Sequence, residues 1–238
     1  MAIKLIVFDV DGTITQHSSS WQYLHEYLNV WDGNADRYQK RFLAGKISYA
    51  EFCRLDACHW KGMRVEKIRK MFQKIPYTKN LKRYIPLLKK EGFKLASIST
   101  GLHMLSERIK RELGFDGIVA NRLLARRGIL TGGVRVDVSF RGKGAAFRRM
   151  LRKFGVGPHE VICIGDGEGD IPMMRQAGFS IAFDPKNKHV MESADYVCKT
   201  KDFKEVYDVI CMAAAQHRLA ERRSGALSSG AVRSVRHG

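Results

Sequence analysis

The N-terminal stretch of the chain is a short, nearly continuous apolar run. Residues Ile3–Phe8 are almost all apolar and lead directly into Asp9 and Asp11, which is typical of a buried strand in a parallel sheet. From Pro76 onward, helical and strand-like patterns alternate. The predicted helices are Leu81–Gly92, His103–Leu113, Gly144–Phe154, Ile171–Ala177 and Asp202–Gln216, and the predicted strands are Lys94–Ser99, Val161–Ile164, Ser180–Phe183 and Asp195–Cys198. This alternation predicts an α/β fold with a Rossmann-like parallel sheet and helices on both faces.

One segment after the second of these helices departs from this alternation. Residues 119–137 contain turn-forming pairs at Arg127–Gly128 and Gly132–Gly133. Because such pairs between apolar stretches favour tight reversals of the chain, we expect a β-hairpin there.

Residues 18–78 follow a third pattern, in which apolar residues recur at helical spacing among many aromatic ones. All three tryptophans, Trp21, Trp31 and Trp60, lie in this segment. We interpret it as a small helical unit, and an aromatic stripe at this spacing is more typical of a core than of a wall that faces substrate. The expected division is a core domain of residues 1–15 and 79–216, an inserted helical cap of residues 16–78, and a flexible basic tail of residues 217–238.

Composition adds an unusual charge to this picture. The 238 residues are 45% hydrophobic and 28% charged, and 42 Lys and Arg against 24 Asp and Glu give a net charge of +18. The excess is concentrated in residues 79–153, with 19 basic and 5 acidic side chains. Such a charge favours nucleic acid, an anionic membrane or an anionic small substrate as a partner, or a basic surface that serves solubility.

The cysteines and the apolar runs indicate where the protein works. Five cysteines are scattered without a CxxC pair, which is typical of reduced thiols rather than a disulfide framework or a zinc site. No signal peptide is visible, and no apolar stretch reaches the roughly 18 residues of a membrane helix. We therefore expect a cytoplasmic protein without a membrane partner.

Polar residues gather where the predicted strands end and helices begin. They are Asp9-Val10-Asp11-Gly12-Thr13, Ser99-Thr100-Gly101, Lys143 in Arg141-Gly142-Lys143-Gly144, and Gly165-Asp166 followed by Asp170. The carboxyl ends of parallel strands meet at one edge of the sheet, where ligands bind. Taken alone, each motif is weak: the serine turn is often a helix cap, and the glycine-rich aspartates resemble a turn or a calcium loop. Their occurrence together and in order favours one site.

The residue types fit the hydrolysis of a phosphate monoester. The Asp9 carboxylate can attack phosphorus and form an aspartyl-phosphate, while Asp11 returns to the same side of the chain and can act as general acid and then base. Asp9 and Asp166 together offer the hard oxygen ligands that Mg²⁺ prefers. The remaining candidates bind the phosphoryl oxygens, namely Ser99, the backbone amides of Thr100 and Gly101, and Lys143.

These motifs resemble those of the haloacid dehalogenase-like (HAD) superfamily of Mg²⁺-dependent phosphohydrolases, and within it the phosphoserine phosphatase-like branch, over about residues 3–212. The resemblance implies the HAD fold, with Asp9 as nucleophile and Asp11 as proton donor. It also implies that Mg²⁺ is held by Asp9, the backbone carbonyl of Asp11 and Asp166. Asp170 is then expected close by, where it orients waters on the metal.

Departures from that branch bear on the substrate. Ser18 stands where phosphoserine phosphatases place a glutamate for the substrate's amino group, and Asp56 stands where they place an arginine for its carboxylate, with Arg54 nearby. Gly169 replaces a usual asparagine. We therefore expect hydrolysis of a small phosphorylated metabolite by an enzyme that is not a strict phosphoserine phosphatase. The alternatives are a nucleotide or nucleic-acid end phosphatase, and a basic RNA-binding module on an inactive HAD scaffold.

Overall fold

The computed structural model describes residues 2–30 and 34–230, and within them a seven-stranded sheet forms the centre of the molecule. Its strands run in the order β4-β3-β2-β1-β5-β6-β7, and all neighbours are parallel except the antiparallel pair β3 and β4. The strands are β1 (Leu5–Phe8), β2 (Lys94–Leu102), β3 (Gly117–Arg126), β4 (Ile129–Arg135), β5 (Val161–Gly165), β6 (Phe179–Ala182) and β7 (Tyr196–Val197). The predicted α/β fold with a parallel sheet is confirmed.

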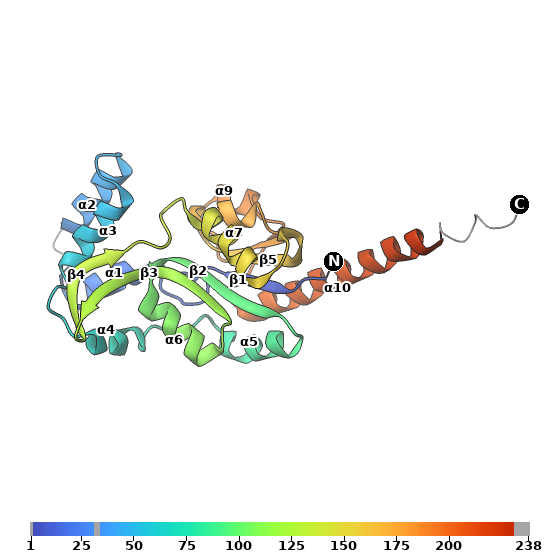
Figure 1. The fold of residues 1–238 in the computed structure, drawn as a ribbon, viewed down its shortest axis with the longest axis horizontal. Coiled ribbons are helices and arrows are strands. Elements are labelled where there is room, and N and C mark those ends of the chain that lie inside the picture. The colour runs from blue at the N-terminus through green and yellow to red at the C-terminus, as the bar shows by residue number, and fades with distance from the viewer. Residues whose placement is uncertain (1, 31–33, 231–238) are drawn as a thin grey trace, which may run out of the picture.

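Helices cover both faces of the sheet (Figure 1). The segment between β1 and β2 carries α1 (Ser20–Tyr27), α2 (Asn34–Leu43), α3 (Tyr49–Cys58) and α4 (Val65–Phe72). The later helices are α5 (Leu81–Lys90), α6 (His103–Leu113), α7 (Lys143–Phe154), α8 (Ile171–Met174), α9 (Lys188–Glu192) and α10 (Phe203–Gly230), with short 3-10 turns at Pro158–Glu160 and Glu168–Asp170.

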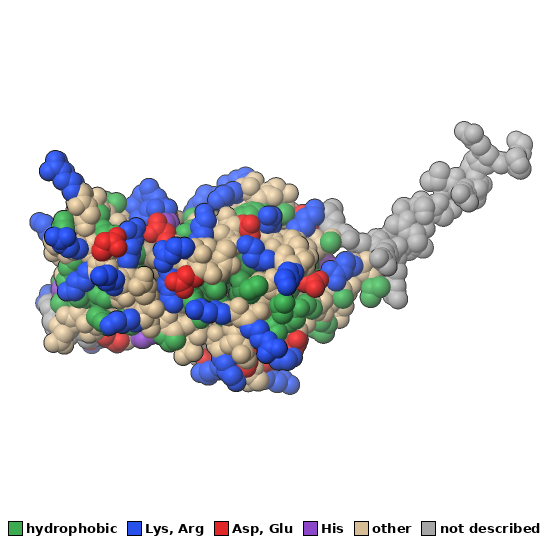
Figure 2. Space-filling model, turned by 90° about the horizontal axis from the view of Figure 1, so that it is seen from below, with side chains coloured by type: hydrophobic (Ala, Val, Ile, Leu, Met, Phe, Trp, Pro, Cys, Tyr) green, Lys and Arg blue, Asp and Glu red, His purple; other side chains and the backbone are tan. Residues whose placement is uncertain are grey.

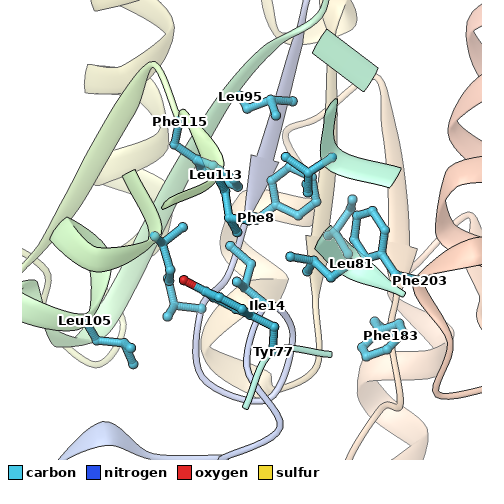
Figure 3. Close-up of a cluster of buried hydrophobic side chains, with 14 of the residues drawn as sticks. Phe8, Ile14, Tyr77, Leu81, Leu95, Leu105, Leu113, Phe115, Phe183 and Phe203 are labelled. Atoms are coloured by element: carbon cyan, nitrogen blue, oxygen red, sulfur yellow. The ribbon is translucent and has the colours of Figure 1, made fainter. Parts of the chain in front are cut away.

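The alternation of side chains along β1 feeds two separate cores. Ile6 and Phe8 point to the face that α5, α6 and α10 cover, whereas Leu5 and Val7 point to the face that α7 and α8 cover. In the first core, the ring of Phe8 lies 5.4 Å from that of Phe115 and 6.0 Å from that of Phe203, as measured between ring centroids (Figure 3). Because β1 is buried on both faces, its sequence reads as a continuous apolar run.

The segment between β1 and β2 is tied to the rest of the fold at its C-terminal end. The buried Arg108 of α6 donates hydrogen bonds to the carbonyl oxygens of Phe72 and Ile75, at 2.5 and 2.7 Å. Thr78 Oγ1 donates to the Thr13 carbonyl oxygen at 2.6 Å. These bonds satisfy backbone groups that burial would otherwise leave unpaired, and they fix where this segment returns to the sheet.

The hairpin forms where we expected it, with one difference in its turns. Arg127–Gly128 is the reversal between β3 and β4, whereas Gly132 and Gly133 lie inside β4. Gly132 has a φ of +80° and lies where the ladder with β3 shifts register, so its role is to accommodate an irregularity in the strand.

The prediction that the last helix ends at Gln216 was wrong. We expected the last helix to end at Gln216 and a flexible tail to follow, but α10 continues to Gly230 and extends away from the sheet (Figure 1). The run from Arg218 to Arg223 consists mostly of strong helix formers, which lets a helix started in the core propagate. The rest of the predicted tail, residues 231–238, lies outside the described residues.

None of the helices within residues 2–30 and 34–230 combines the length and the apolar character that a membrane crossing requires. The five cysteines are all free thiols.

Candidate functional site

The predicted site residues of the core converge at the carboxyl ends of β1, β2 and β5. Asp9 and Asp11 follow β1, Thr100 and Gly101 belong to the last residues of β2, and Asp166 follows β5. Since β1 is paired with β2 on one side and with β5 on the other, these chain ends are neighbours. This is the edge of a parallel sheet at which ligands bind.

A tight turn after β1 allows the loop that carries Asp11 to pass close to Asp166. Gly12 has a φ of +90°, a conformation that residues with a side chain rarely adopt. A Cβ atom at Gly12 would also collide with the carboxylate of Asp166. The glycine of this motif is therefore required both by the turn and by the close approach of the β5 end.

Three buried carboxylates form the floor of the site. Oxygen atoms of Asp9, Asp166 and Asp170 all lie within 4.8 Å of one another. Lys143 Nζ bonds to Asp9 Oδ1 and lies 2.5 Å from Asp170 Oδ1, and Lys186 Nζ lies 2.7 Å from Asp166 Oδ2. We call Asp9, Asp166, Asp170 and Lys143 the acidic floor.

Burial and mutual repulsion shift the protonation of the acidic floor. Burial, followed by the charge of Asp170, holds the pKa of Asp9 well above its usual range, although Lys143 opposes this shift. Burial likewise raises the pKa of Asp166. For Lys143, burial lowers the pKa, but the charges of Asp170 and Asp9 outweigh it and raise the pKa above its ordinary value. Closely spaced carboxylates of this kind lower their repulsion by binding a proton or a cation.

The geometry of the acidic floor fits a divalent cation. Carboxylate oxygens are the hard ligands that Mg²⁺ takes in proteins, with waters completing its shell. Asp170 is held in place by the backbone, because its Oδ2 accepts hydrogen bonds from the N–H groups of Asp166 at 3.1 Å and Gly167 at 3.0 Å. Its other oxygen faces Lys143, so Asp170 both fixes the loop after β5 and positions the lysine.

Asp11 lies in a different environment from the acidic floor. Its Oδ2 accepts a hydrogen bond from the hydroxyl of Ser20 at 2.9 Å, while its Oδ1 is buried without a hydrogen-bond partner. Burial raises the pKa of the Asp11 carboxyl, and the Ser20 hydrogen bonds offset only part of that shift. A buried oxygen without a partner is costly, so Asp11 Oδ1 has a free capacity to exchange a proton with a bound molecule.

The end of β2 is organised by hydrogen bonds that join it to the helices between β1 and β2. Ser99 Oγ accepts from the N–H of Gly101 at 2.9 Å, which leaves the hydroxyl proton to be donated. The carbonyl oxygen of Thr100 faces three donors, Trp21 Nε1 at 3.1 Å, Tyr49 Oη at 3.3 Å and Asn121 Nδ2 at 2.8 Å. The orientation of the Thr100 peptide is therefore set from both sides.

These residues surround a cavity of about 380 Å³, a size typical of small-molecule sites. Its core side is lined by Asp9, Asp11, Thr100, Gly101, Lys143, Asp166, Gly167, Glu168, Gly169, Asp170 and Lys186, and its other side by Ser18, Ser19, Trp21, Gln39, Tyr49, Phe52 and Cys53, with Phe140 between them. Of the predicted phosphate-binding residues, Ser99 is not among the described residues that line the cavity; it is buried, and its hydroxyl oxygen accepts the hydrogen bond from the Gly101 N–H.

We call Trp21, Tyr49, Phe52 and Phe140 the aromatic wall, and it splits the predicted aromatic stripe in two. Trp60 is fully buried and belongs to the core, as expected, whereas Trp21, Tyr49 and Phe52 are half-buried and line the cavity. The expectation that the stripe is mainly core is therefore wrong for Tyr49 and Phe52, whereas Trp21 both packs against the core and lines the cavity. Trp31 lies outside the described residues.

The positions that differ from phosphoserine phosphatases take distinct places. Ser18 and Gly169 line the cavity, as their alignment implied. Asp56 does not, because it is buried in α3 with its carboxylate 3.6 Å from His25 Nε2. Arg54 is exposed and forms a salt bridge of 2.7 Å with Glu51. In this geometry neither Asp56 nor Arg54 takes the place of the arginine at the cavity.

Three residues of the site were missed in the sequence. Lys186 follows β6 as the aspartates follow β1 and β5, so the strand-end rule alone would have found it. Ser20 begins α1 and reaches both Asp11 and the N–H of Leu102, the latter at 3.0 Å, and no local pattern predicts such a contact. Asn121 lies in the middle of β3, where a buried amide in a strand is itself a signal of a specific hydrogen-bonding role.

Comparison with known proteins places this fold and site in a family. The family model of the haloacid dehalogenase-like hydrolases matches residues 6–175. The chain belongs to the haloacid dehalogenase-like hydrolase family. The matched residues include β1 from Ile6 onward, β2, β5 and all the carboxylates of the acidic floor, and they span the inserted helices as well.

Relatives within this family share one name. The chain is 30% identical over 208 residues to a phosphoserine phosphatase of Methanocaldococcus jannaschii, a match that covers 87% of this chain and 97% of that protein. It is 32% identical over 186 residues to a phosphoserine phosphatase of Archaeoglobus fulgidus, covering 77% of this chain and 53% of that longer protein. The predicted membership in the phosphoserine phosphatase-like branch of HAD-type phosphatases is confirmed.

Solved structures support the same grouping. A phosphoserine phosphatase determined with a phospho-aspartyl intermediate analogue superimposes with a TM-score of 0.74 at 28% identity, over 88% of this chain and 99% of that one. A substrate-bound phosphoserine phosphatase complex gives the same values. These likenesses do not support the expectation that this chain departs from phosphoserine, so that expectation depends on the residues of the cavity.

Proposed function

We propose that this protein is a Mg²⁺-dependent phosphomonoester hydrolase that acts on a small phosphorylated metabolite through an aspartyl-phosphate intermediate. One observation carries the proposal: the acidic floor, with Asp9 bonded to Lys143, lies at the bottom of a cavity of metabolite size, next to Asp11 with its unpaired oxygen. The core consists of residues 1–15 and 79–216, and residues 16–78 form the cap that supplies the other side of the cavity.

The proposed reaction has two steps. A carboxylate oxygen of Asp9 attacks phosphorus, the bond from phosphorus to the alcohol oxygen breaks, and Asp11 donates its proton to that oxygen as the alcohol leaves. Water then attacks the phosphorus of the aspartyl-phosphate while Asp11 accepts its proton, and phosphate leaves with Asp9 restored. In this proposal, Lys143 and the backbone of Thr100 and Gly101 hold the phosphoryl oxygens during both steps. Ser99, which was predicted to bind these oxygens directly, instead accepts a hydrogen bond from the Gly101 N–H and positions that backbone.

The metal in this proposal is held by Asp9, the backbone carbonyl of Asp11 and Asp166, with Asp170 orienting its waters. When bound, Mg²⁺ supplies positive charge that allows the carboxylate of Asp9 and an anionic phosphate to approach each other. Lys143 contributes a further positive charge, because it contacts both Asp9 and Asp170.

The proposed substrate is not phosphoserine, although phosphoserine phosphatase is the name of the relatives above. The support comes from the lining of the cavity. Ser18 offers no negative charge to an amino group, and Arg54 points into solvent rather than toward a substrate carboxylate. Because a site that lacks a partner for a buried charge binds that charge poorly, an amino acid would lose most of its usual contacts.

The proposed location of the reaction is the cytoplasm, where free thiols are stable.

The test is a phosphate-release assay with and without Mg²⁺. The panel contains sugar phosphates, nucleotides, phosphoserine, p-nitrophenyl phosphate and a 3′-phosphorylated oligonucleotide, and the Asp9→Asn variant is the control. We expect turnover that a chelator abolishes, that Mg²⁺ restores, and that Asp9→Asn lowers by about 10⁴-fold. Absence of metal-dependent turnover on every compound would contradict the proposal, and a kcat/KM for phosphoserine orders of magnitude above the others would contradict its substrate.

The oligonucleotide tests the second candidate function, an end phosphatase of nucleic acid. The net charge of +18 favours it, and Figure 2 shows Lys and Arg side chains spread over the whole of one face among fewer acidic ones. An enzyme of that kind would prefer the oligonucleotide, with a kcat/KM that falls steeply as salt rises. A preference for small phosphates with little salt dependence would reject it.

A further inference from the structure

The cap side of the cavity offers rings rather than charges. Tyr49 and Phe52 come from α3, Trp21 from α1, and Phe140 from the loop before α7. The ring centroid of Tyr49 lies 6.2 Å from that of Phe52 and 6.3 Å from that of Phe140, so the aromatic surface bridges the two sides of the cavity. Such spacings are those at which aromatic rings attract each other.

The polar atoms of Trp21 and Tyr49 already form hydrogen bonds within the protein. Trp21 Nε1 and Tyr49 Oη both donate to the carbonyl oxygen of Thr100. Because these donors are held by the core, Trp21 and Tyr49 contribute their rings to the cavity and not their polar tips. Phe52 and Phe140 have no polar tip at all.

The rings at the aromatic wall are more exposed than a ring that only packs in the core. Phe140 is 40% exposed, and Phe42, which stacks on Phe52 with a centroid distance of 5.5 Å, is also only half-buried. Trp60, by comparison, has no exposed surface. Apolar surface that lines a cavity and stays open to solvent marks a place where a ligand binds.

Charged side chains on the described cap side point elsewhere. Arg54 is paired with Glu51 on the surface and Asp56 is buried beside His25. The cations that do line the cavity, Lys143 and Lys186, are bonded to aspartates at the core side. Within residues 2–30 and 34–230, the cap side of the cavity is therefore lined by aromatic rings and by the uncharged side chains of Ser18, Ser19, Gln39 and Cys53, without a charged group.

We propose that the alcohol half of the substrate carries a flat apolar group, such as an aromatic ring, that the aromatic wall holds. This inference rests on the proposed phosphatase function and adds the class of leaving group to it. The phosphate is bound at the acidic floor, and the ring is bound by Trp21, Tyr49, Phe52 and Phe140. Zwitterionic and strongly hydrated alcohols find no partner on that wall.

The test compares alcohols of similar intrinsic reactivity. The probes are phenethyl phosphate, propyl phosphate and phosphoserine, with p-nitrophenyl phosphate as a measure of general phosphatase activity. We expect the enzyme to hydrolyse phenethyl phosphate with a kcat/KM about 10- to 100-fold above that for propyl phosphate, the range that apolar contacts supply. Equal values, or a higher value for propyl phosphate or phosphoserine, would overturn the inference and leave the proposed function standing. Failure to hydrolyse all four compounds would overturn both.

Variants of the aromatic wall test whether its rings cause the preference for phenethyl phosphate. Phe140→Ala, at an exposed loop position, and Phe52→Ala are each expected to lower the specificity constant kcat/KM on phenethyl phosphate by about 10-fold and that on propyl phosphate less than twofold. The matched control is Tyr27→Ala, which removes an exposed ring of α1 away from the cavity. It should change kcat/KM on neither substrate. If Phe52→Ala does not fold, Phe140→Ala and Phe52→Leu decide the question. Equal losses on both substrates would mean that the wall is structural, and would contradict the inference.

Discussion

At the acidic floor, the carboxylates of Asp9, Asp166 and Asp170 are each bonded to a lysine, whereas the aromatic wall presents rings whose polar atoms are turned toward Thr100. In the proposed function, the acidic floor therefore binds the charged phosphate, and the aromatic wall selects the shape of the alcohol. Because a phosphate group is the same in every substrate and the alcohol is not, substitutions at the floor should affect all substrates alike. Substitutions at the wall should affect substrates according to their leaving group.

Apart from the Asp9→Asn control, the largest effect is expected from Lys143→Met. This change leaves Asp9 and Asp170 buried side by side without their shared cation, so we expect a loss of about 3 kcal/mol in the free energy of unfolding and a fall of at least about 10²-fold in kcat on every substrate. Denaturant titration and phosphate release measure the two effects. Lys186→Met is the matched control: Lys186 is 48% exposed and, among the residues that the structure describes, forms a salt bridge only with Asp166, so its stability loss should stay below about 1 kcal/mol.

Ser20→Ala should have an intermediate effect that is also independent of the substrate. It removes the hydrogen bond to Asp11 Oδ2 and leaves the Leu102 N–H without its acceptor. We expect kcat to fall about 10-fold on all substrates, since one buried hydrogen bond to a charged group contributes about 1.5 kcal/mol or more. Ser193→Ala, which deletes a hydroxyl bonded to the His189 carbonyl on α9, is the control and should leave kcat unchanged. A loss confined to bulky substrates would break the distinction between floor and wall.

Tyr49→Phe tests the link between the two regions. The change keeps the ring in the wall and removes one of the donors to the Thr100 carbonyl, the longest of the three at 3.3 Å. Because Trp21 and Asn121 still hold that carbonyl, we expect kcat/KM to fall only about threefold, by a similar factor for each substrate. A strong loss on phenethyl phosphate alone would show that the hydroxyl itself contacts the alcohol.

The smallest effect concerns the attachment of the cap, away from both regions. Burial raises the pKa of Glu112, but hydrogen bonds from Tyr77 and Arg108 outweigh it and lower the pKa below its ordinary value of 4.5. A lowered pKa in the folded state means that Glu112 contributes stability above pH 4.5 and loses it as the pH falls through the folded value. Because the side chain is partly exposed, Glu112→Gln should cost only about 0.5 kcal/mol at pH 7. Thermal unfolding at about pH 7 and about pH 3.5 should show this difference shrink at the lower pH.

The sequence carried more information about the floor than about the wall. Asp9, Asp11, Asp166 and Asp170 were predictable because each follows a buried apolar strand, and the ends of parallel strands must meet. Ser20 could not be found this way, since its contact depends on how the first helix after β1 lies against the end of β2. The aromatic residues were visible, but whether a ring faces a core or a cavity is decided by packing between elements distant in the chain.

Two errors have the same origin in packing. Asp56 was expected to face the substrate because of its place in an alignment, yet one turn of a helix separates a buried face from a cavity face, and α3 buries Asp56 while it presents Tyr49 and Phe52. The extension of α10 to Gly230 depends on a helix that the core has already nucleated. The composition of residues 217–238 by itself had favoured a flexible tail.

The anchoring of Trp21 and Tyr49 to Thr100 has a consequence for how such an enzyme changes over evolutionary time. These two rings are tied to the peptide that borders the phosphate in the proposed function, so replacing either one is expected to disturb catalysis. Phe52 and Phe140 meet their neighbours through ring contacts. A lineage or a protein engineer can therefore reshape the cavity at positions 52 and 140 and acquire a new substrate, while the chemistry inherited with the acidic floor stays intact.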